Sequence, residues 1–189
     1  MYRPFIQNLH DAHRRMECVL TLLRLQIDSL RPQNDPAVYT FLSNAINYMH
    51  NFPRLNHHAC EELILNRLIA HERGSRELCA GLTQQHQTFQ EQESQLLLQI
   101  RRAQASESDA VTNIRKIGTT YCEMHADHIR REERDALPMA VDTLRVEEWQ
   151  TIIGQSRLVR DPFDRTDRMK GFEALYEYLV ASPEAHSVN

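Results

Sequence analysis

Two stretches of the sequence, NHHACEEL and DHIRREER, each place a histidine four residues before a glutamate. The pairs are His57 with Glu61 and His128 with Glu132. Residues four apart share one face of a helix and lie about 6 Å apart, so each pair would present an imidazole beside a carboxylate. Helical bundles build two-metal sites from facing pairs of this kind. The spacing therefore predicts a metal site with ligands from two helices.

Two further histidines, His13 and His86, lie in the two helical segments that lack such a pair. Residues that face each other across a helical hairpin lie at similar distances from its turn. With turns centred near residues 34, 74 and 106, the histidines of neighbouring segments differ in height by only about 3 to 8 Å. All four histidines can therefore share one level of a bundle.

Four amphipathic segments carry these residues, with breaks at 31–36, 71–76 and 104–108. Apolar residues recur in each segment at three- and four-residue steps, as an amphipathic helix requires. Only 5 glycines occur in 189 residues, which also favours helices over sheets. We predict an all-α fold, in which residues 1–141 form an antiparallel up-and-down four-helix bundle. Pro53 should bend the second helix, and Pro138 should kink or end the fourth.

Residues 142–189 have a different character, with two shorter helical patterns joined by a loop. We predict that they form a C-terminal helical extension packed on the bundle, with a flexible tail from Ser182. Four large apolar residues should make the packing contacts: Trp149, Phe163, Phe172 and Leu175.

Composition argues against several classes of protein. The net charge of -4 leaves no basic face for nucleic acid, and no apolar run approaches the roughly 20 residues of a membrane span. The four cysteines show no CxxC pair, so a zinc or iron-sulfur motif is disfavoured. Scattered thiols within helical patterns suit a reducing compartment, and we expect a cytoplasmic protein.

The predicted donor set points to a particular kind of metal. Burying imidazoles and carboxylates costs several kcal/mol unless each polar group is satisfied. A two-metal centre satisfies them, because carboxylates from two helices can bridge the ions while imidazoles bind at the ends. Mixed nitrogen and oxygen ligation favours iron, with manganese as the alternative.

The motifs HHACEEL, DAHRR, QQHQ and HIRREERDALP resemble the hemerythrin-like, or HHE cation-binding, domain family over about residues 5–141. The resemblance implies two iron ions, His13 with His57 on one and His86 with His128 on the other, under bridging carboxylates and an oxo or hydroxo bridge. The metal ligands that it implies are His13, His57, Glu61, His86, His128 and Glu132.

The sequence departs from the oxygen-carrying hemerythrins, which have a second histidine one turn from the third-helix ligand. Leu82 and Gln90 stand at those positions here. A pattern of four histidines and two glutamates is similar to that of di-iron proteins implicated in repair of iron centres and in nitric oxide handling. The resemblance thus implies a protein with open metal positions that binds, senses or reduces dioxygen, peroxide or nitric oxide during oxidative or nitrosative stress.

Two roles remain open from the sequence. Catalysis would take the form of a peroxidase or nitric oxide reductase type of activity, with an electron donor that the sequence does not identify. The alternative is an iron storage or delivery protein, whose partner is another protein that receives iron for repair of its iron centre.

Some ligand assignments also stay open. His58 and Glu62 are spaced as well as His57 and Glu61, which are preferred because HHACEELIL then aligns with HIRREERDA. Five other residues could replace a ligand or support one from one or two turns away: His10, Glu17, Glu93, Tyr121 and His125.

Overall fold

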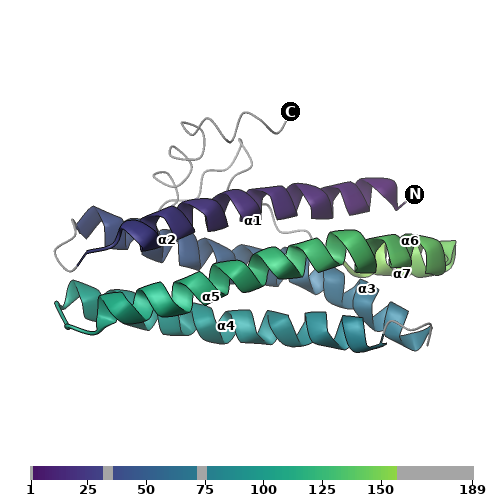
Figure 1. Cartoon of the computed structure of the whole chain (residues 1–189). Helices are drawn as coiled ribbons and strands as arrows, with labels where there is room; N and C mark the ends of the chain where they lie inside the picture. Colours follow the sequence, from purple (N-terminus) through teal and green to yellow (C-terminus); the bar gives the residue numbers. More distant parts are fainter. Residues whose placement is uncertain (1, 32–35, 72–75, 157–189) are drawn as a thin grey trace.

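The computed structural model describes residues 2–31, 36–71 and 76–156, and every regular element within them is a helix (Figure 1). This confirms the all-α prediction. In this part of the chain, no helix combines the length and the apolar character needed to span a bilayer. The α-helices are α1 (Arg3–Ser29), α2 (Pro36–Phe52), α3 (His58–Ala70), α4 (Arg76–Gln104), α5 (Ala110–Arg131), α6 (Leu137–Thr143) and α7 (Val146–Gln155), and two π-helical turns are η1 (Pro53–His57) and η2 (Glu132–Ala136).

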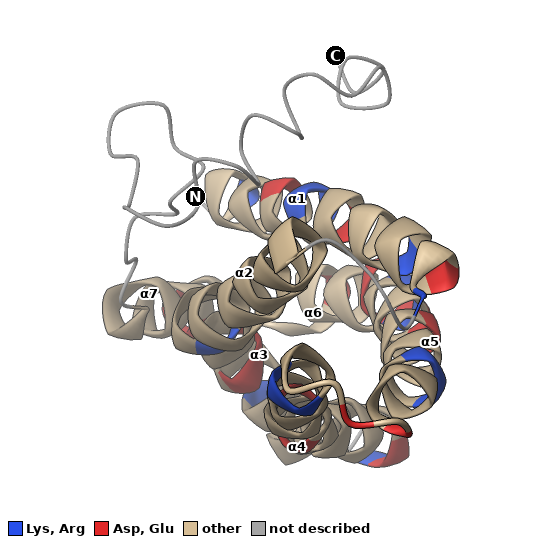
Figure 2. Cartoon of the chain, turned by 90° about the vertical axis from the view of Figure 1, so that its left-hand side faces the viewer, with Lys and Arg blue, Asp and Glu red and all other residues tan. Residues whose placement is uncertain are grey.

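The long helices pack side by side and enclose one interior. α1 contacts α2 and α5, while α4 contacts α2, α3 and α5. Figure 2, which looks toward one end of the molecule, shows these helices arranged around a common centre. Each helix turns its apolar stripe inward, which removes that surface from water and supplies the main stabilisation of the fold.

The core consists of two apolar clusters. One lies toward the α1–α2 and α4–α5 connections and includes Ile27, Ile46 and Ile100. The other lies toward the opposite end, where Leu68 and Trp149 belong to it. Along α1 and α4, and along the continuous runs α2–η1–α3 and α5–η2–α6, the sequence passes from one cluster to the other through a short buried polar stretch. The fold therefore places a polar layer across the middle of its apolar core.

Both π-helical turns occur beside a proline. Pro53 opens η1, and Pro138 follows η2 by two residues. A proline inside a helix has no N–H to donate and its ring crowds the carbonyl one turn earlier, so the regular hydrogen-bond pattern cannot continue through it. The chain instead bonds one residue further back, from His58 N–H to Pro53 and from Leu137 N–H to Glu132. Single π turns of this kind often mark functional positions.

The segment after the bundle begins without a break, since α6 runs through residues 141 and 142. α7 then contacts α3, and Trp149, only 1% exposed, stacks on Tyr2 and meets Phe5 edge-on. The second helix predicted for the extension lies outside the described residues, as do Phe163, Phe172, Leu175 and the predicted flexible tail.

Candidate metal centre

The polar layer between the two apolar clusters contains all six residues predicted as ligands. On α1, His13 lies between Leu9 of one cluster and Met16 of the other. His86 stands in the same way between Leu82 and Phe89. Each member of the layer is at most 5% exposed; the members are His13, His57, His58, Glu61, His86, His128 and Glu132.

These residues form two groups. Within each group, the nitrogen and oxygen atoms that could bind a metal ion all lie within 4.8 Å of one another. Glu61 belongs to both groups, so its carboxylate lies where the two meet. The first group is His13, His57, Glu61 and Glu132, and the second is His58, Glu61, His86 and His128.

The two carboxylates each face histidines of both groups. Glu61 Oε1 lies 2.7 Å from His57 Nε2, and its Oε2 lies 3.6 Å from His86 Nε2. Glu132 Oε2 lies 3.3 Å from His13 Nε2 and 3.2 Å from His128 Nε2. This arrangement suits a pair of cations, because each carboxylate lies between histidines of the two groups.

Three of the histidines are oriented by hydrogen bonds on their outer side. In each, Nδ1 contacts a side-chain oxygen, so that Nε2 points to the centre. A partner on the outer nitrogen fixes both the ring plane and the tautomer of a metal-binding histidine. The partners are Glu133 for His13 (3.0 Å), Glu62 for His86 (3.0 Å) and Gln85 for His128 (3.1 Å).

The Nε2 atoms of His86 and His128 lie 3.0 Å apart. Both rings direct Nδ1 toward an acceptor oxygen, so each neutral ring would carry its proton there and leave a lone pair on Nε2. Two lone pairs at this distance repel each other. The pair is stable only with a cation, either a proton or a metal ion, close to both nitrogens.

Several buried polar atoms at the centre have no hydrogen-bond partner. Leaving such an atom unsatisfied costs about 1–3 kcal/mol, and more when the group is charged. Ligation by metal ions would satisfy the glutamate oxygens and one nitrogen of each histidine. A set of imidazole nitrogens with carboxylate oxygens suits iron or manganese. The residues present therefore fit a two-metal centre. The unsatisfied atoms include His57 Nδ1, His58 Nε2, Glu61 Oε2 and Glu132 Oε1.

The pKa values of the histidines in the centre shift in different directions. Burial lowers the pKa of His57, and it lowers that of His58 well below the usual value. Burial opposes the charged form of His13 as well, but hydrogen bonds with three glutamates outweigh it and raise its pKa to about 11. Burial would also raise the pKa of Glu61, yet the neighbouring His57 and His13 hold it well below its usual range.

His58 is the candidate ligand that the sequence analysis left as an alternative. Neighbouring residues of a regular α-helix point about 100° apart, so periodicity required a choice between His57 and His58. The π turn ending at His57 changes the helical phase, and both rings are buried. The count of well-placed histidines is thus five rather than four. Pro53 together with the His-His doublet is the signal that could have indicated this.

Glu62, which the sequence paired with His58, belongs to neither group. Its carboxylate contacts the outer nitrogen, Nδ1, of His86. Glu17 is exposed, and His125 is buried against Phe89 with ring centroids 3.5 Å apart. Glu93 and Tyr121 are buried and hydrogen-bond to each other. Among the described residues, none of these five belongs to either group.

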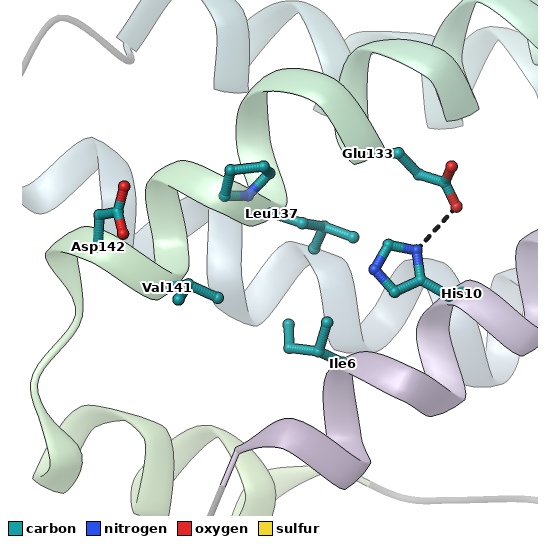
Figure 3. Close-up of a pocket in the computed structure, with 7 residues that line it drawn as sticks. Ile6, His10, Glu133, Leu137, Val141 and Asp142 are labelled. Atoms are coloured by element: carbon teal, nitrogen blue, oxygen red, sulfur yellow. Dashed lines mark hydrogen bonds and ion pairs between the residues drawn. The ribbon is translucent and has the colours of Figure 1, made fainter.

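A pocket of about 220 Å³ lies beside the first group, between α1 and α6 (Figure 3). Its apolar wall includes Ile6, Leu137 and Val141. At one side, His10 Nδ1 lies 2.8 Å from Glu133 Oε1, and the same oxygen contacts His13. The pocket is therefore separated from a buried candidate ligand by one carboxylate.

Replacing Glu133 with alanine should weaken metal binding about 10- to 100-fold, because His13 would lose the partner that orients its ring. Competition with a chromophoric chelator measures this affinity. Glu147→Ala, which removes an exposed carboxylate on α7, is the matched control and should bind metal as the parent protein does. Equal affinity in both variants would show that His13 does not depend on this hydrogen bond.

Comparison with known proteins agrees with this geometry. No curated protein matches the chain. The family model for the hemerythrin HHE cation-binding domain matches residues 5–140, which contain every residue of both groups. The chain therefore belongs to the hemerythrin HHE cation-binding domain family.

Proposed function

We propose that the chain is a non-haem di-iron protein, an antiparallel up-and-down four-helix bundle that binds, senses or reduces small oxidants. Its ligands would be the six predicted residues together with His58. Dioxygen, peroxide and nitric oxide are the oxidants that such a centre suits, and protection from oxidative or nitrosative stress is the role we infer. The four cysteines are scattered through helical patterns without a CxxC pair, and we therefore expect a reducing, cytoplasmic setting.

When bound, a pair of iron ions would supply one-electron steps between ferrous and ferric forms and coordination positions for a small ligand. Glu61 and Glu132 would hold the ions together, since each faces histidines of both groups. The chain contributes orientation through Glu62, Gln85 and Glu133, and it keeps bulk water away by burial.

The observation that carries this proposal is the position of Glu61. Its carboxylate belongs to both buried groups, and one of its oxygens has no hydrogen-bond partner. A structural carboxylate buried this deeply would normally have both oxygens satisfied. A residue shared by two metal ions accounts for the arrangement.

A second candidate function is iron storage or delivery, and the cluster of His10, His13 and Glu133 favours it. His10 and Glu133 line the pocket (Figure 3), and His13 also belongs to the first buried group. The cluster therefore offers a metal ion a stepwise route between the centre and the pocket. A recipient protein would then receive iron from this end of the bundle.

One experiment separates the two functions. The iron-loaded, reduced protein is mixed with hydrogen peroxide in the presence of a strong iron chelator, and near-ultraviolet absorption and retained iron are followed together. Fast oxidation with iron retained supports the oxidant function. Transfer of iron to the chelator, without oxidation of the centre and without unfolding, would contradict it and support delivery.

A further inference from the structure

A chain of hydrogen-bonded polar groups runs from the interior of the bundle to its surface. Tyr121 of α5 is 0% exposed, and its hydroxyl donates to Glu93 Oε1 at 2.8 Å. Glu93 of α4 is 2% exposed, and its Oε2 lies 2.9 Å from Nδ1 of His50 on α2. The His50 side chain is 30% exposed. A proton that leaves Tyr121 thus has a continuous path to water.

On its other side, aromatic rings lie between Tyr121 and the candidate metal centre. Its ring centroid lies 4.6 Å from that of His125 and 6.2 Å from that of Phe89. The Phe89 ring in turn lies 5.1 Å from that of His128, a candidate ligand. Both nitrogens of His125 are buried without a hydrogen-bond partner, so the chain of hydrogen bonds stops at Tyr121.

The two sides of Tyr121 therefore suit different transfers, one of a proton and the other of an electron. Toward Glu93 lies a hydrogen bond, which can move a proton. Toward His128 lie closely spaced aromatic rings, which provide short steps for an electron. A buried phenol cannot release an electron alone, because a positive charge in an apolar core costs many kcal/mol. A carboxylate oxygen at hydrogen-bond distance removes that obstacle by taking the proton at the same moment.

We propose that Tyr121 is a redox-active residue, which gives one electron to the oxidised metal centre and its phenolic proton to Glu93. This inference rests on the proposed function, since it requires a metal centre that reacts with an oxidant. Tyr121 would supply an electron when the centre itself has only one to give. Glu93 and His50 are positioning residues that carry the proton away.

The step balances with hydrogen peroxide as the oxidant. Peroxide takes up two electrons, together with two protons that the solvent supplies, and leaves as two water molecules. One electron comes from a metal ion, and the other comes from Tyr121. The phenolic O–H bond breaks and its proton passes to Glu93 Oε1, which converts the carboxylate into a carboxylic acid. That acid then loses one proton through His50 to water, which restores the carboxylate. The product is a neutral tyrosyl radical on Tyr121.

The test uses the full iron-loaded chain, with the centre first brought to one ferrous and one ferric ion so that it has a single electron to give. This protein is mixed with hydrogen peroxide and frozen within milliseconds for electron paramagnetic resonance. Iron content and peroxide consumption are measured on the same samples. We expect an organic radical signal that narrows when the protein contains ring-deuterated tyrosine. Tyr121→Phe should abolish this signal while iron content stays unchanged, and Glu93→Gln should reduce it, because an amide accepts the hydrogen bond but not the proton.

Tyr39→Phe is the matched control, because Tyr39 is also a buried tyrosine of the core but its hydroxyl has no hydrogen-bond partner. It should leave the radical signal unchanged. A tyrosyl signal that persists in Tyr121→Phe, or no signal although the protein binds iron and consumes peroxide, would overturn this inference alone. Failure to bind iron or to consume peroxide would overturn the proposed function, and the inference with it.

Discussion

Replacement of Glu61 by alanine should lower the iron content from about two ions per chain to fewer than one. Glu61 is the residue shared by both buried groups, so in the proposed centre its loss would remove an oxygen ligand from each ion at once. The remaining histidines would also lose the negative charge that offsets two cations in a buried setting. Metal analysis after loading with excess ferrous iron and gel filtration measures the effect.

The control for this experiment is His71→Ala. His71 is a partly buried histidine that pairs with Glu148 Oε1 at 2.9 Å and belongs to neither group. It should retain about two irons per chain. Circular dichroism verifies that both variants keep their helices. Full iron content in a folded Glu61→Ala protein would contradict the shared position that we assign to this carboxylate.

Removal of the metal should lower the thermal stability of the protein markedly. A ligand that binds only the folded state stabilises it by about 2.7 kcal/mol at a hundredfold excess over its Kd. For a chain of this size, that corresponds to a fall in Tm of roughly 5–10 °C. Melting curves of the iron-loaded protein with and without a strong chelator measure the difference.

The effect of the metal should depend on Glu61 and on pH. In Glu61→Ala, the chelator should change Tm very little, because little iron is bound at the start. Metal affinity should also fall as pH falls, since His13, with its pKa raised to about 11, must release a proton before Nε2 can bind a metal ion. A chelator that shifts Tm equally in the parent protein and in Glu61→Ala would place the stabilising metal elsewhere.

The sequence predicted the parts of the centre that follow a regular helical period. His13 and His86 lie on apolar stripes, and the spacing of His57 with Glu61 places both on one helix face. Such regularities survive folding because burial of the stripe fixes which side of the helix faces inward. The common level of the four histidines along the bundle could also be estimated from their distances to the turns.

The rest depends on local breaks in that period and on contacts between helices. His58 joins the centre because the π turn that begins at Pro53 changes which side of the helix faces inward. A regular helical period does not predict such a change. The partners that orient the ligands come partly from other helices: Glu133 reaches His13 across the bundle, and Glu62 reaches His86. The hydrogen bond between Tyr121 and Glu93 likewise joins positions 28 residues apart, for which the sequence carries no spacing rule.

We propose that seven buried side chains from the middle of the bundle hold a pair of iron ions. Diffraction from crystals of the iron-loaded protein, recorded at the iron absorption edge, would locate these ions. We expect two anomalous peaks, both next to Glu61. One should lie beside His13 and His57, and the other beside His58, His86 and His128. A single peak, or iron bound only away from Glu61, would contradict this proposal.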